Sequence, residues 1–398
     1  MGNNSGAASC PRLLSSVVSR HACHLVCIAV LSSITLLLWW TSSGMLPLWA
    51  TTMTSGRLLE PVEEPPRATL LHGGLASAIA PPCLARSSKA TSELLVIGDW
   101  GGRGRSPYMT PVSRAVGVVS GQLAQALSAV AVLSPGDAFY PSGVKKVNDF
   151  RFRVTFEEQF SHPSLQIPWY MALGNHDYEG KLKPLMEYGK TSRRWNLPSL
   201  YYSHVFSMNL SESSSVTYQI LFLDTNRLVR QFKRLPERDS DQWDWISDQL
   251  ASSTADWIFA VGHHPIYSVA DRGTNPILVQ ELLPLLDRHG VALYFSGHDH
   301  NLQHVRTSNH SVEMFVVGAG SYTTASMAHK ATVPIEFLKF HSGAWQRGGI
   351  ASVSVGGCAS TVTLHHVNPT TNPPSATIAY SYTVANPRKR PACCVPET

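Results

Sequence analysis

Short apolar runs alternate with longer segments that repeat an apolar residue every three or four positions, beginning at Glu93. Compact runs bounded by turn residues are typical of buried strands, and the longer period is typical of amphipathic helices. The predicted strands are 94–97, 129–133, 168–173, 216–223, 257–261, 291–295, 314–317, 350–355, 361–365 and 377–384. The predicted helices are 111–128, 147–160, 241–250 and 278–289, and the first of them opens with a proline.

The order of these elements predicts the fold class. Strands and helices alternate at first, and the last part of the pattern consists mostly of strands. Alternation of this kind builds a sheet with helices on its faces, and the later strands close it with antiparallel pairs. We therefore expect a sheet-based α/β domain over residues 93–385, without clear internal repeats.

An uncharged apolar stretch precedes this domain. No residue from 21 to 56 is Asp, Glu, Lys or Arg, and the run 25–40 is almost wholly apolar. Together with 41–50 it reaches the roughly 17–25 residues that a spanning helix needs. Arg12 and Arg20 precede it and no basic excess follows, which keeps the N-terminus in the cytosol. Two interpretations remain: an uncleaved signal-anchor, which we prefer, or a long signal peptide that is cleaved.

Composition shifts divide the chain into four parts. Residues 1–50 form the cytosolic N-terminus and the predicted membrane segment. Residues 51–92 are rich in Pro, Ala and Ser without a sustained period, which is typical of a linker. The folded domain follows at 93–385, and 386–398 is a basic tail with two cysteines. This order predicts a membrane-anchored domain in the secretory or endolysosomal lumen or outside the cell, or a secreted one.

The charge and cysteine content narrow the function classes. A net charge of +5 is mild, and no run of Lys and Arg is longer than 388–390, so we expect no nucleic-acid partner. None of the seven cysteines lies between residues 84 and 357, which excludes a dense disulfide framework. A bridge between Cys83 and Cys358 fits an oxidising lumen, but the sequence leaves the pairing open. Asn209 and Asn309 begin glycosylation motifs, which predict a glycoprotein.

Five predicted strands end in turns that carry metal-ligand residues. These residues are Asp99, Asp137 with Tyr140, Asn175, His263, and His298 with His300. In an α/β sheet, residues that follow the strand ends gather on one rim. His298 and His300 are two apart in an extended segment, so both side chains point to one side. Any one of these residues alone would be read as a turn cap, but the five turns together predict a metal centre.

Seven donors exceed the need of one ion and suit two ions that share a carboxylate. Oxygen donors mixed with imidazole suit Fe, Mn or Zn, and the lack of cysteine argues against a structural zinc site. Two such cations roughly 3.5–4 Å apart would acidify a bound water and clamp the oxygens of a phosphoryl transfer. Gly-x-Ser-x-Gly and His-Glu-x-x-His are absent, and Lys190 lacks the upstream glycine of a P-loop because position 184 is proline.

These motifs resemble those of the metallophosphoesterases. The matching segments are Asp99-x-Gly101, Gly136-Asp137-x-x-Tyr140, Gly174-Asn175-His176-Asp177, Gly262-His263-x-Pro265 and Gly297-His298-x-His300. From about residue 94 to 388 the chain looks most like the purple acid phosphatases of the small, tartrate-resistant type. Most metallophosphoesterases open with Asp-x-His, whereas here Gly101 stands in place of the histidine. Tyr140 supplies the missing donor, as in purple acid phosphatases.

The resemblance implies a fold, a reaction and a set of roles. The fold would be a four-layer αββα metallophosphatase sandwich of two packed mixed β-sheets. The enzyme would be an acid phosphatase that hydrolyses small-molecule or protein phosphate monoesters through a metal-bound hydroxide. Asp99, Asp137, Tyr140 and His300 would hold Fe(III), while Asp137, Asn175, His263 and His298 would hold Fe(II), Zn(II) or Mn(II). His176 would contact phosphate or protonate the leaving group, unless it only orients its turn.

Two departures from the family pattern affect the site. His263 is followed by His264, so the ligand is ambiguous by one position, and the Gly-His-x-Pro frame favours His263. Arg272 stands where the family carries another active-site histidine; it cannot donate a proton near acidic pH but can bind phosphate through two hydrogen bonds. The basic segment 227–238 lies where the family has a loop over the site. It would be a solvated loop, which we favour, or a substrate clamp.

Three other functions remain open at this point. A phosphodiesterase acting on nucleotides or lipids would use the same pair of metal ions. An iron pair could instead generate radicals or bind a partner without hydrolysis. A membrane-tethered binding protein with an inactive site is the third alternative, and the presence of every expected ligand argues against it.

Overall fold

The computed structural model describes residues 90–389 except 213, 236–238 and 343–346. The predicted membrane segment at 25–50 lies outside the described residues, as do most of the linker 51–92 and most of the tail 386–398. Within the described part of the chain, none of the helices has both the length and the apolar character needed to cross a bilayer. The signal-anchor therefore stays a prediction from sequence.

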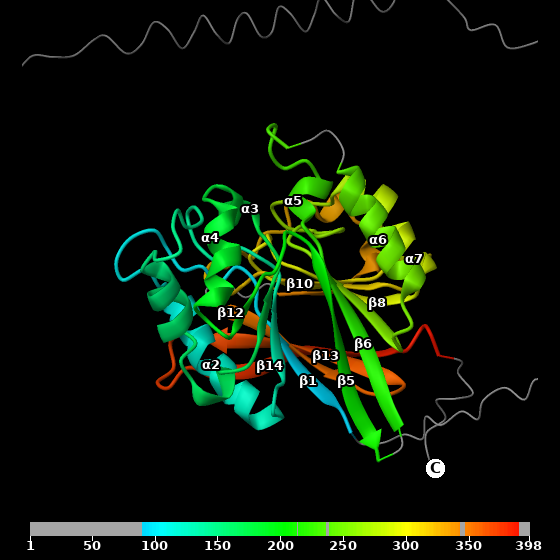
Figure 1. Cartoon of the computed structure of the whole chain (residues 1–398), viewed down its shortest axis with the longest axis horizontal. Coiled ribbons are helices and arrows are strands. Elements are labelled where there is room, and N and C mark those ends of the chain that lie inside the picture. Colours follow the sequence, from blue (N-terminus) through cyan, green and yellow to red (C-terminus); the bar gives the residue numbers. More distant parts are fainter. Residues whose placement is uncertain (1–89, 213, 236–238, 343–346, 390–398) are drawn as a thin grey trace, which may run out of the picture. The chain divides into compact units, whose positions relative to one another are not determined.

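Two seven-stranded mixed sheets form the framework of the described domain (Figure 1). The first sheet has the order β14 (Ser375–Ala385), β13 (Ala359–Asn368), β12 (Gly348–Val355), β1 (Ser92–Val96), β2 (Ala131–Ser134), β3 (Trp169–Met171) and β4 (Trp195–Asn196). Strands β1 to β4 are parallel, and β12, β13 and β14 add antiparallel pairs beside β1. The predicted closing strands thus extend the first sheet.

The second sheet repeats this plan. Its order is β11 (Leu338–His341), β9 (Leu302–Val305), β10 (Glu313–Val317), β8 (Val291–Ser296), β7 (Trp257–Val261), β6 (Ser214–Phe222) and β5 (Tyr202–Ser211). Strands β6, β7, β8 and β10 are parallel, while β5, β9 and β11 pair antiparallel. Parallel strands at the centre of each sheet bring the loops after their carboxyl ends to common rims, where ligands bind in such folds.

Helices cover the outer face of each sheet. The longer ones are α2 (Pro111–Leu127), the π-helical η1 (Phe152–Glu158), α6 (Ser240–Ser252), η4 (Leu278–Leu282) and α7 (Leu283–Arg288). Short helices are α3 (Asn175–Tyr178), α4 (Leu182–Glu187), α5 (Thr225–Leu228), η2 (Pro163–Leu165), η3 (Tyr188–Lys190), η5 (Lys330–Thr332) and η6 (Ile335–Phe337). Figure 1 shows α2 beside the first sheet and α6 and α7 beside the second. The expected α/β sandwich of two mixed sheets is confirmed.

Two apolar clusters hold these layers together. The larger joins Leu133 and Ala351 of the first sheet to Phe259 and Phe295 of the second, and it also includes Val116 of α2. The smaller packs the helices against the second sheet and contains Ile246, Ile258 and Leu286. Burial of this kind contributes roughly 25 cal/mol per Å² of apolar surface, so sandwich and helices form one cooperative unit.

Local signals explain where α2 begins and ends. The Thr110 hydroxyl accepts the Ser113 N–H at 2.9 Å, and Pro111 occupies the first helical position. Ser128 ends the helix in the left-handed region at φ 55°. A Cβ on Gly117 would overlap the Gln159 carbonyl, so glycine there lets η1 approach closely.

Several predictions of secondary structure need correction. The helix predicted over 147–160 is shorter, because residues 145–150 form turns and the helical segment is Phe152–Glu158. Strands β4, β5, β9 and β11 were not predicted. The clearest signal missed is β5, in which alternate residues from Tyr202 to Leu210 face the core between the sheets. These strands depend on pairing with distant neighbours more than on their own composition.

Three features noted in the sequence have defined surroundings. Cys358 is disulfide-bonded, and it is the only cysteine within the described residues. The predicted pairing with Cys83 therefore involves a residue outside them. Asn209 on β5 and Asn309 in the loop after β9 are both exposed, as a glycosylated asparagine requires. Glycosylation stays a prediction.

An aromatic cluster packs the first sheet against the segment after Asp99. The Trp100 ring lies 5.4–6.4 Å, between centroids, from five other rings, including Phe156 and Trp169. Its Nε1 donates to the Ser134 hydroxyl at 2.9 Å. This bond links the segment that follows β1 to the end of β2. Edge-to-face contacts of this type stabilise beyond the area they bury.

The cluster yields a stability prediction. Trp169 is fully buried, so Trp169→Ala should lower the free energy of unfolding by about 3–5 kcal/mol through loss of contacts and a cavity. Phe150 is 46 % exposed, and Phe150→Ala should cost less than about 1 kcal/mol. Urea unfolding followed by circular dichroism measures both. Similar losses in the two variants would contradict the assignment of Trp169 to the core.

Candidate metal centre

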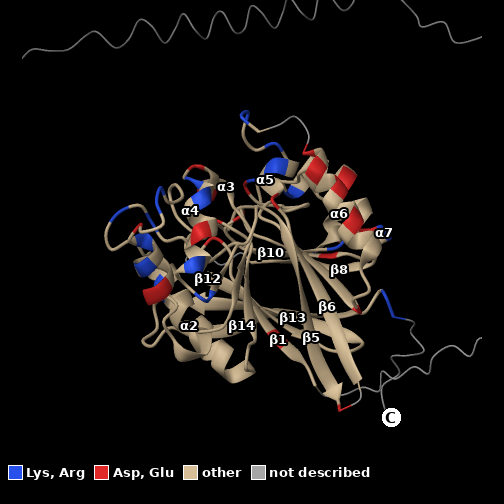
Figure 2. Cartoon of the chain, in the orientation of Figure 1, with Lys and Arg blue, Asp and Glu red and all other residues tan. Residues whose placement is uncertain are grey.

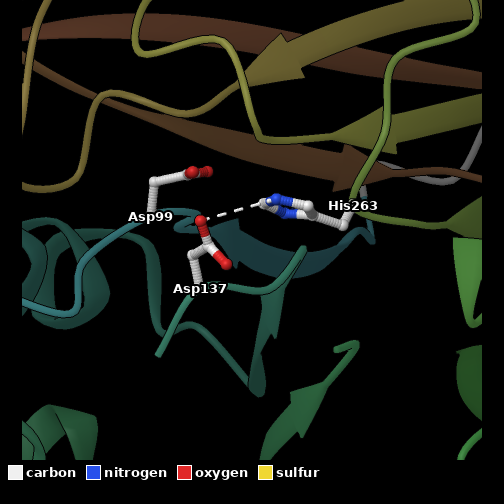
Figure 3. A group of neighbouring side chains, drawn as sticks. All are labelled: Asp99, Asp137 and His263. Atoms are coloured by element: carbon white, nitrogen blue, oxygen red, sulfur yellow. Dashed lines mark ion pairs between the residues drawn. The ribbon is translucent and has the colours of Figure 1, made fainter. Parts of the chain in front are cut away.

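The loops after five strands bring the seven predicted ligand residues into one connected cluster. Loops of the first sheet supply Asp99, Asp137, Tyr140 and Asn175, and loops of the second supply His263, His298 and His300. Within this cluster, ligand atoms of Asp99, Asp137 and His263 all lie within 4.8 Å of one another (Figure 3). The seven residues were expected to lie together because strand ends meet on one rim, and the structure brings them together.

The Tyr140 hydroxyl is the hub of the first half of the cluster. It donates to Asp99 Oδ1 and Asp137 Oδ2, both at 3.0 Å, and lies 3.1 Å from His300 Nε2. His300 Nε2 is also 3.5 Å from Asp99 Oδ1. The four residues predicted to surround one ion therefore point their donor atoms at a common region.

His263 organises the second half. Its Nε2 lies 3.0 Å from Asn175 Oδ1, 3.1 Å from His298 Nδ1 and 3.5 Å from Asp137 Oδ2. Its Nδ1 lies 2.9 Å from the Pro135 carbonyl, a partner that only an N–H can satisfy. This bond leaves the Nε2 lone pair free to face the cluster, as metal-binding histidines usually do. Asp137 contacts both halves, and Figure 3 shows its contact with His263.

The neighbouring histidine points elsewhere. His264 Nδ1 lies 2.9 Å from Thr225 Oγ1, and its Nε2 lies 3.3 Å from Gln231 Oε1. Burial, together with the charges of His263 and Arg272, lowers its pKa well below the usual value. Both ring nitrogens of His264 thus have partners outside the carboxylates, so the geometry favours His263 as the ligand.

Three of the clustered residues have strained backbone. Asp99 and Asp137 have φ 57° and His298 has φ 69°, in the left-handed region that side chains other than glycine rarely adopt. Conformations of this kind cost of order 1–3 kcal/mol each and persist where the surroundings impose them. The backbone N–H of His298 donates to Asp99 at 3.1 Å, which ties two of the three together.

A residue that the sequence analysis did not assign holds the two central turns. The Asp177 carboxylate accepts the N–H groups of Gly174, Asp137 and Ala138 at 2.9–3.1 Å. Burial, with the nearby charge of Asp137, raises its pKa well above the usual value. An acidic residue three positions after Gly174 is a helix-capping pattern, which was the available signal. Thr225, whose hydroxyl accepts the N–H of His263 at 3.0 Å, had no such signal.

Glycines in the motifs leave room for the carboxylates. A Cβ on Gly174 would overlap Asp137 Oδ1, and one on Gly297 would overlap Asp99 Oδ2. A Cβ on Gly101 would lie 2.6 Å from the Phe139 nitrogen, closer than real side chains come. The glycines beside the ligand residues are therefore required by close packing.

The charges of the cluster call for a cation. Asp99 and Asp137 are 0 % and 1 % exposed, and no Lys or Arg of the described chain pairs with either carboxylate. Burial and the charges of both carboxylates raise the pKa of Tyr140 well above its usual value. Buried charges are costly unless they are paired or coordinate a metal. Oxygen and imidazole donors without sulfur suit Fe, Zn or Mn, so the residues present fit two ions.

The two predicted catalytic residues lie at different depths. The His176 ring is 4.7 Å from Tyr140, its backbone N–H donates to Asp137 Oδ1 at 2.9 Å, and its Nδ1 contacts the Pro141 carbonyl. The exposed Arg272 is anchored through its backbone N–H, which donates to Asp299 at 3.0 Å. The pKa of His298 is lowered mainly by burial, then by the neighbouring histidines and by the charge of Arg272. His176 therefore adjoins the cluster, and Arg272 stands at its rim.

The basic segment 227–238 is described up to residue 235. Arg227 Nη2 donates to Asp239 Oδ1 at 3.1 Å, and Arg234 Nη2 donates to the Tyr178 carbonyl at 2.7 Å. Gln231, in the same segment, reaches His264. The segment is thus bonded to Tyr178 and His264, which neighbour the cluster in the sequence, and none of these bonds reaches a predicted ligand residue.

Comparisons with known proteins agree with this geometry. Residues 93–302 match the calcineurin-like phosphoesterase family. Tartrate-resistant acid phosphatase type 5 of Homo sapiens is 37% identical over 294 residues, which cover 71% of this chain and 89% of that protein. Purple acid phosphatase 7 of Arabidopsis thaliana is 34% identical over 249 residues, covering 59% of this chain and 71% of that protein.

Two solved structures share the fold. GAP50, described as the anchor in the inner membrane complex of Plasmodium, superimposes with TM-score 0.63 at 22% identity, covering 75% of this chain and 90% of that one. The purple acid phosphatase PPD1 of yellow lupin has TM-score 0.54 at 17% identity, covering 78% of this chain and 57% of that one. At these identities the likeness concerns the fold alone.

The orientation of the paired histidines yields a prediction. His263→Ala removes a side chain that faces Asn175, His298 and Asp137, so bound metal should fall by at least one ion per chain. His264→Ala should leave the metal content unchanged, since its ring bonds to Thr225 and Gln231. Elemental analysis of both purified variants, with circular dichroism to check folding, measures this. Metal loss confined to His264→Ala would show that the assignment is reversed.

Proposed function

Because this chain belongs to the calcineurin-like phosphoesterases, with purple acid phosphatases among its relatives, we propose that it hydrolyses phosphate monoesters at acidic pH with a dinuclear metal centre. The observation that carries the proposal is the single cluster formed by all seven predicted donors, with Asp137 in contact with both halves. Asp99, Asp137, Tyr140 and His300 would hold Fe(III). Asp137, Asn175, His263 and His298 would hold Fe(II), Zn(II) or Mn(II).

A metal pair at this site would supply an acidified water for in-line attack on phosphorus and would offset the charge of the phosphoryl oxygens. The strained turns, and the glycines that leave room for the carboxylates, would orient the residues that hold the metal pair. Asp177 would keep the turns of Asp137 and Asn175 at a fixed separation, because its carboxylate accepts N–H groups from both sides. No phosphorylated enzyme is needed in this scheme.

His176 and Arg272 would act on the substrate. The Nδ1 of His176 contacts the Pro141 carbonyl, so this nitrogen carries a proton, and the ring lies beside Tyr140. A protonated Nε2 would be the group that donates to the leaving oxygen. Arg272 remains charged at any working pH and can bind two phosphoryl oxygens at once. We therefore assign proton donation to His176 and phosphate binding to Arg272.

The compartment is part of the proposal. The membrane segment predicted at 25–50 would place the domain in the secretory or endolysosomal lumen or outside the cell. The disulfide bond of Cys358 supports an oxidising compartment, since disulfides are rare in the cytosol. The exposed positions of Asn209 and Asn309 are compatible with it.

Hydrolysis and metal content test the proposal together. The full-length protein should contain two metal ions per chain and hydrolyse p-nitrophenyl phosphate at acidic pH much faster than bis-p-nitrophenyl phosphate. Faster cleavage of the diester would make it a phosphodiesterase. Redox cycling of iron without turnover of either ester would favour the non-hydrolytic alternative.

Asp137→Asn should abolish the centre, because its carboxylate contacts both halves. We expect loss of both ions and a fall in kcat/KM of roughly a hundredfold or more, exceeding the effect of removing an outer partner of a ligand. Asp241→Asn, on the exposed face of α6, is the matched control and should change neither quantity. Retention of two ions by Asp137→Asn would contradict its shared position.

Tyr140 should determine the colour. A phenolate bound to Fe(III) absorbs visible light, as the resemblance to purple acid phosphatases implies, so Tyr140→Phe should lose the visible band while its ring still packs against His176. Tyr322→Phe changes the adjacent ring, 5.2 Å away, and should leave the spectrum intact. Spectra of iron-loaded proteins decide the point, and an unchanged band in Tyr140→Phe would refute the assignment.

A further inference from the structure

A cavity of about 350 Å³ lies between the loop after Asp99, the start of α2 and the turn between β13 and β14. Among its lining residues in the described chain, only Arg103 and Arg114 are charged. The others are apolar and include Pro107, Pro111, Pro369 and Pro374. The cavity therefore combines two positive charges with an apolar wall and contains no acidic side chain to balance them.

Arg103 has a donor without a partner. Its Nε is buried and makes no hydrogen bond to any described residue, and its Nη2 reaches only the Ser106 carbonyl, at 3.4 Å. Because this Nε is closed to solvent, an anion in the cavity would meet the terminal nitrogens of the guanidinium instead, of which, within the described chain, only Nη2 has a bond, a long one. Such an anion would neutralise the guanidinium charge.

Arg114 supplies the second charge. It lies on the exposed side of the first turn of α2, and its side chain forms no hydrogen bond or ion pair with another described residue. Two guanidinium groups that line one cavity repel each other unless an anion lies between them. A phosphate group can accept hydrogen bonds from both, since arginine presents several N–H donors in a planar fork.

The walls of this cavity are preformed. Each of the four prolines has a fixed φ, so little conformational freedom remains to be lost when a ligand enters. The loop itself is closed by the Arg103 N–H, which donates to the Tyr108 carbonyl at 2.9 Å. Binding there would require little rearrangement of the protein.

The same loop leads to the metal centre. It packs against the segment that carries Tyr140: the Tyr140 N–H donates to the Gly101 carbonyl at 3.2 Å, and Gly104 fits against Pro141. Arg103 also lies near Tyr322, where its charge opposes the effect of burial on the pKa of that phenol. The Tyr322 ring, 39 % exposed, is 5.2 Å from Tyr140 and 5.7 Å from His300. The cavity is thus one side chain removed from the ligand residues.

The loop after β1 is visible at the left of Figure 1, and Figure 2 shows basic residues on it. Arg105 belongs to this loop but does not line the cavity. The cavity is therefore lined by one arginine of this loop, Arg103, and by Arg114 from the first turn of α2.

We propose that Arg103 and Arg114 form an anion subsite that receives a second phosphate group of the substrate. The preferred substrates would then be phosphate monoesters whose leaving group carries another phosphate at the end of an apolar or flexible spacer. This rests on the proposed phosphatase function, because the first phosphate is taken to occupy the metal centre. Neither arginine takes part in bond cleavage.

A series of α,ω-alkanediol bisphosphates measures the subsite and its distance from the centre. The full-length enzyme is assayed with spacers of three to eight carbons and with the n-alkyl monophosphate of each length. After division by two for the equivalent ester groups, kcat/KM should favour the best bisphosphate about tenfold, as one charge-assisted hydrogen bond would provide. The preference should pass through a maximum with spacer length.

The variants Arg103→Gln and Arg114→Gln should each reduce this preference, and the double variant should remove it. Monophosphate turnover should stay within about twofold of the unmodified enzyme in all three. Arg105→Gln is the matched control, since it removes one charge from the same loop outside the cavity. An equal loss of preference in Arg105→Gln, or no preference at any spacer length, would overturn the proposal.

Calorimetry with hexane-1,6-bisphosphonate and hexylphosphonate separates this proposal from the phosphatase assignment. Absence of hydrolysis of every ester would refute the proposed function alone. Tighter binding of the bisphosphonate that is lost in the double variant would then still support the subsite. Equal affinity for the two phosphonates, or undiminished binding by the double variant, would exclude it. The double variant could lose bisphosphonate binding while turnover shows no dependence on spacer length. That result would assign the cavity to a free anion and overturn the substrate assignment.

Discussion

The rest of the site depends on the burial of two carboxylates, Asp99 and Asp137, side by side. Neither pairs with a Lys or Arg of the described chain, so their charge must be met by histidines and by bound cations. Much of the local structure serves to hold them there. Both residues have left-handed backbone, Gly174 and Gly297 leave space for their oxygens, and Asp177 gathers the N–H groups of the turn. Without a cation at this place, no interaction would offset the energetic cost of this strained backbone.

The two sheets contribute different chemistry to this centre. Loops of the first sheet carry the carboxylates, the phenol and the amide, and loops of the second sheet carry the three histidines. Contacts such as Tyr140 to His300 and Asn175 to His263 therefore cross from one sheet to the other. The separation of the proposed ligand residues depends on how the sheets pack, and therefore on the apolar cluster that includes residues of both sheets.

Basic residues lie around the centre. Arg272 is anchored beside it through its backbone N–H, and the segment from Arg227 contacts His264 through Gln231. The Arg103–Arg114 cavity adds a further positive region on the opposite, first-sheet side. In the proposed scheme the ligand residues support the hydrolysis itself, whereas these positive charges would influence which phosphate esters bind near the metal centre. Loop residues outside the ligand motifs can be substituted more easily than the ligand residues, because they carry no part of the sandwich core.

Ten of the strands and the gathering of the seven candidate donor residues could be predicted from the sequence, because strand ends and turn residues show in a few neighbouring positions. A short apolar run that ends in glycine and a donor residue is a local pattern, and Gly101 with Tyr140 distinguishes one branch of the family. Strand β5, the orientation of His264 and the role of Asp177 were settled only by the folded chain. The cavity that Arg103 and Arg114 share with prolines of the β13–β14 turn had no signal in the sequence. Arrangements of this kind join segments from tens to hundreds of positions apart, and their geometry follows from how layers pack, a property that no short stretch of sequence carries.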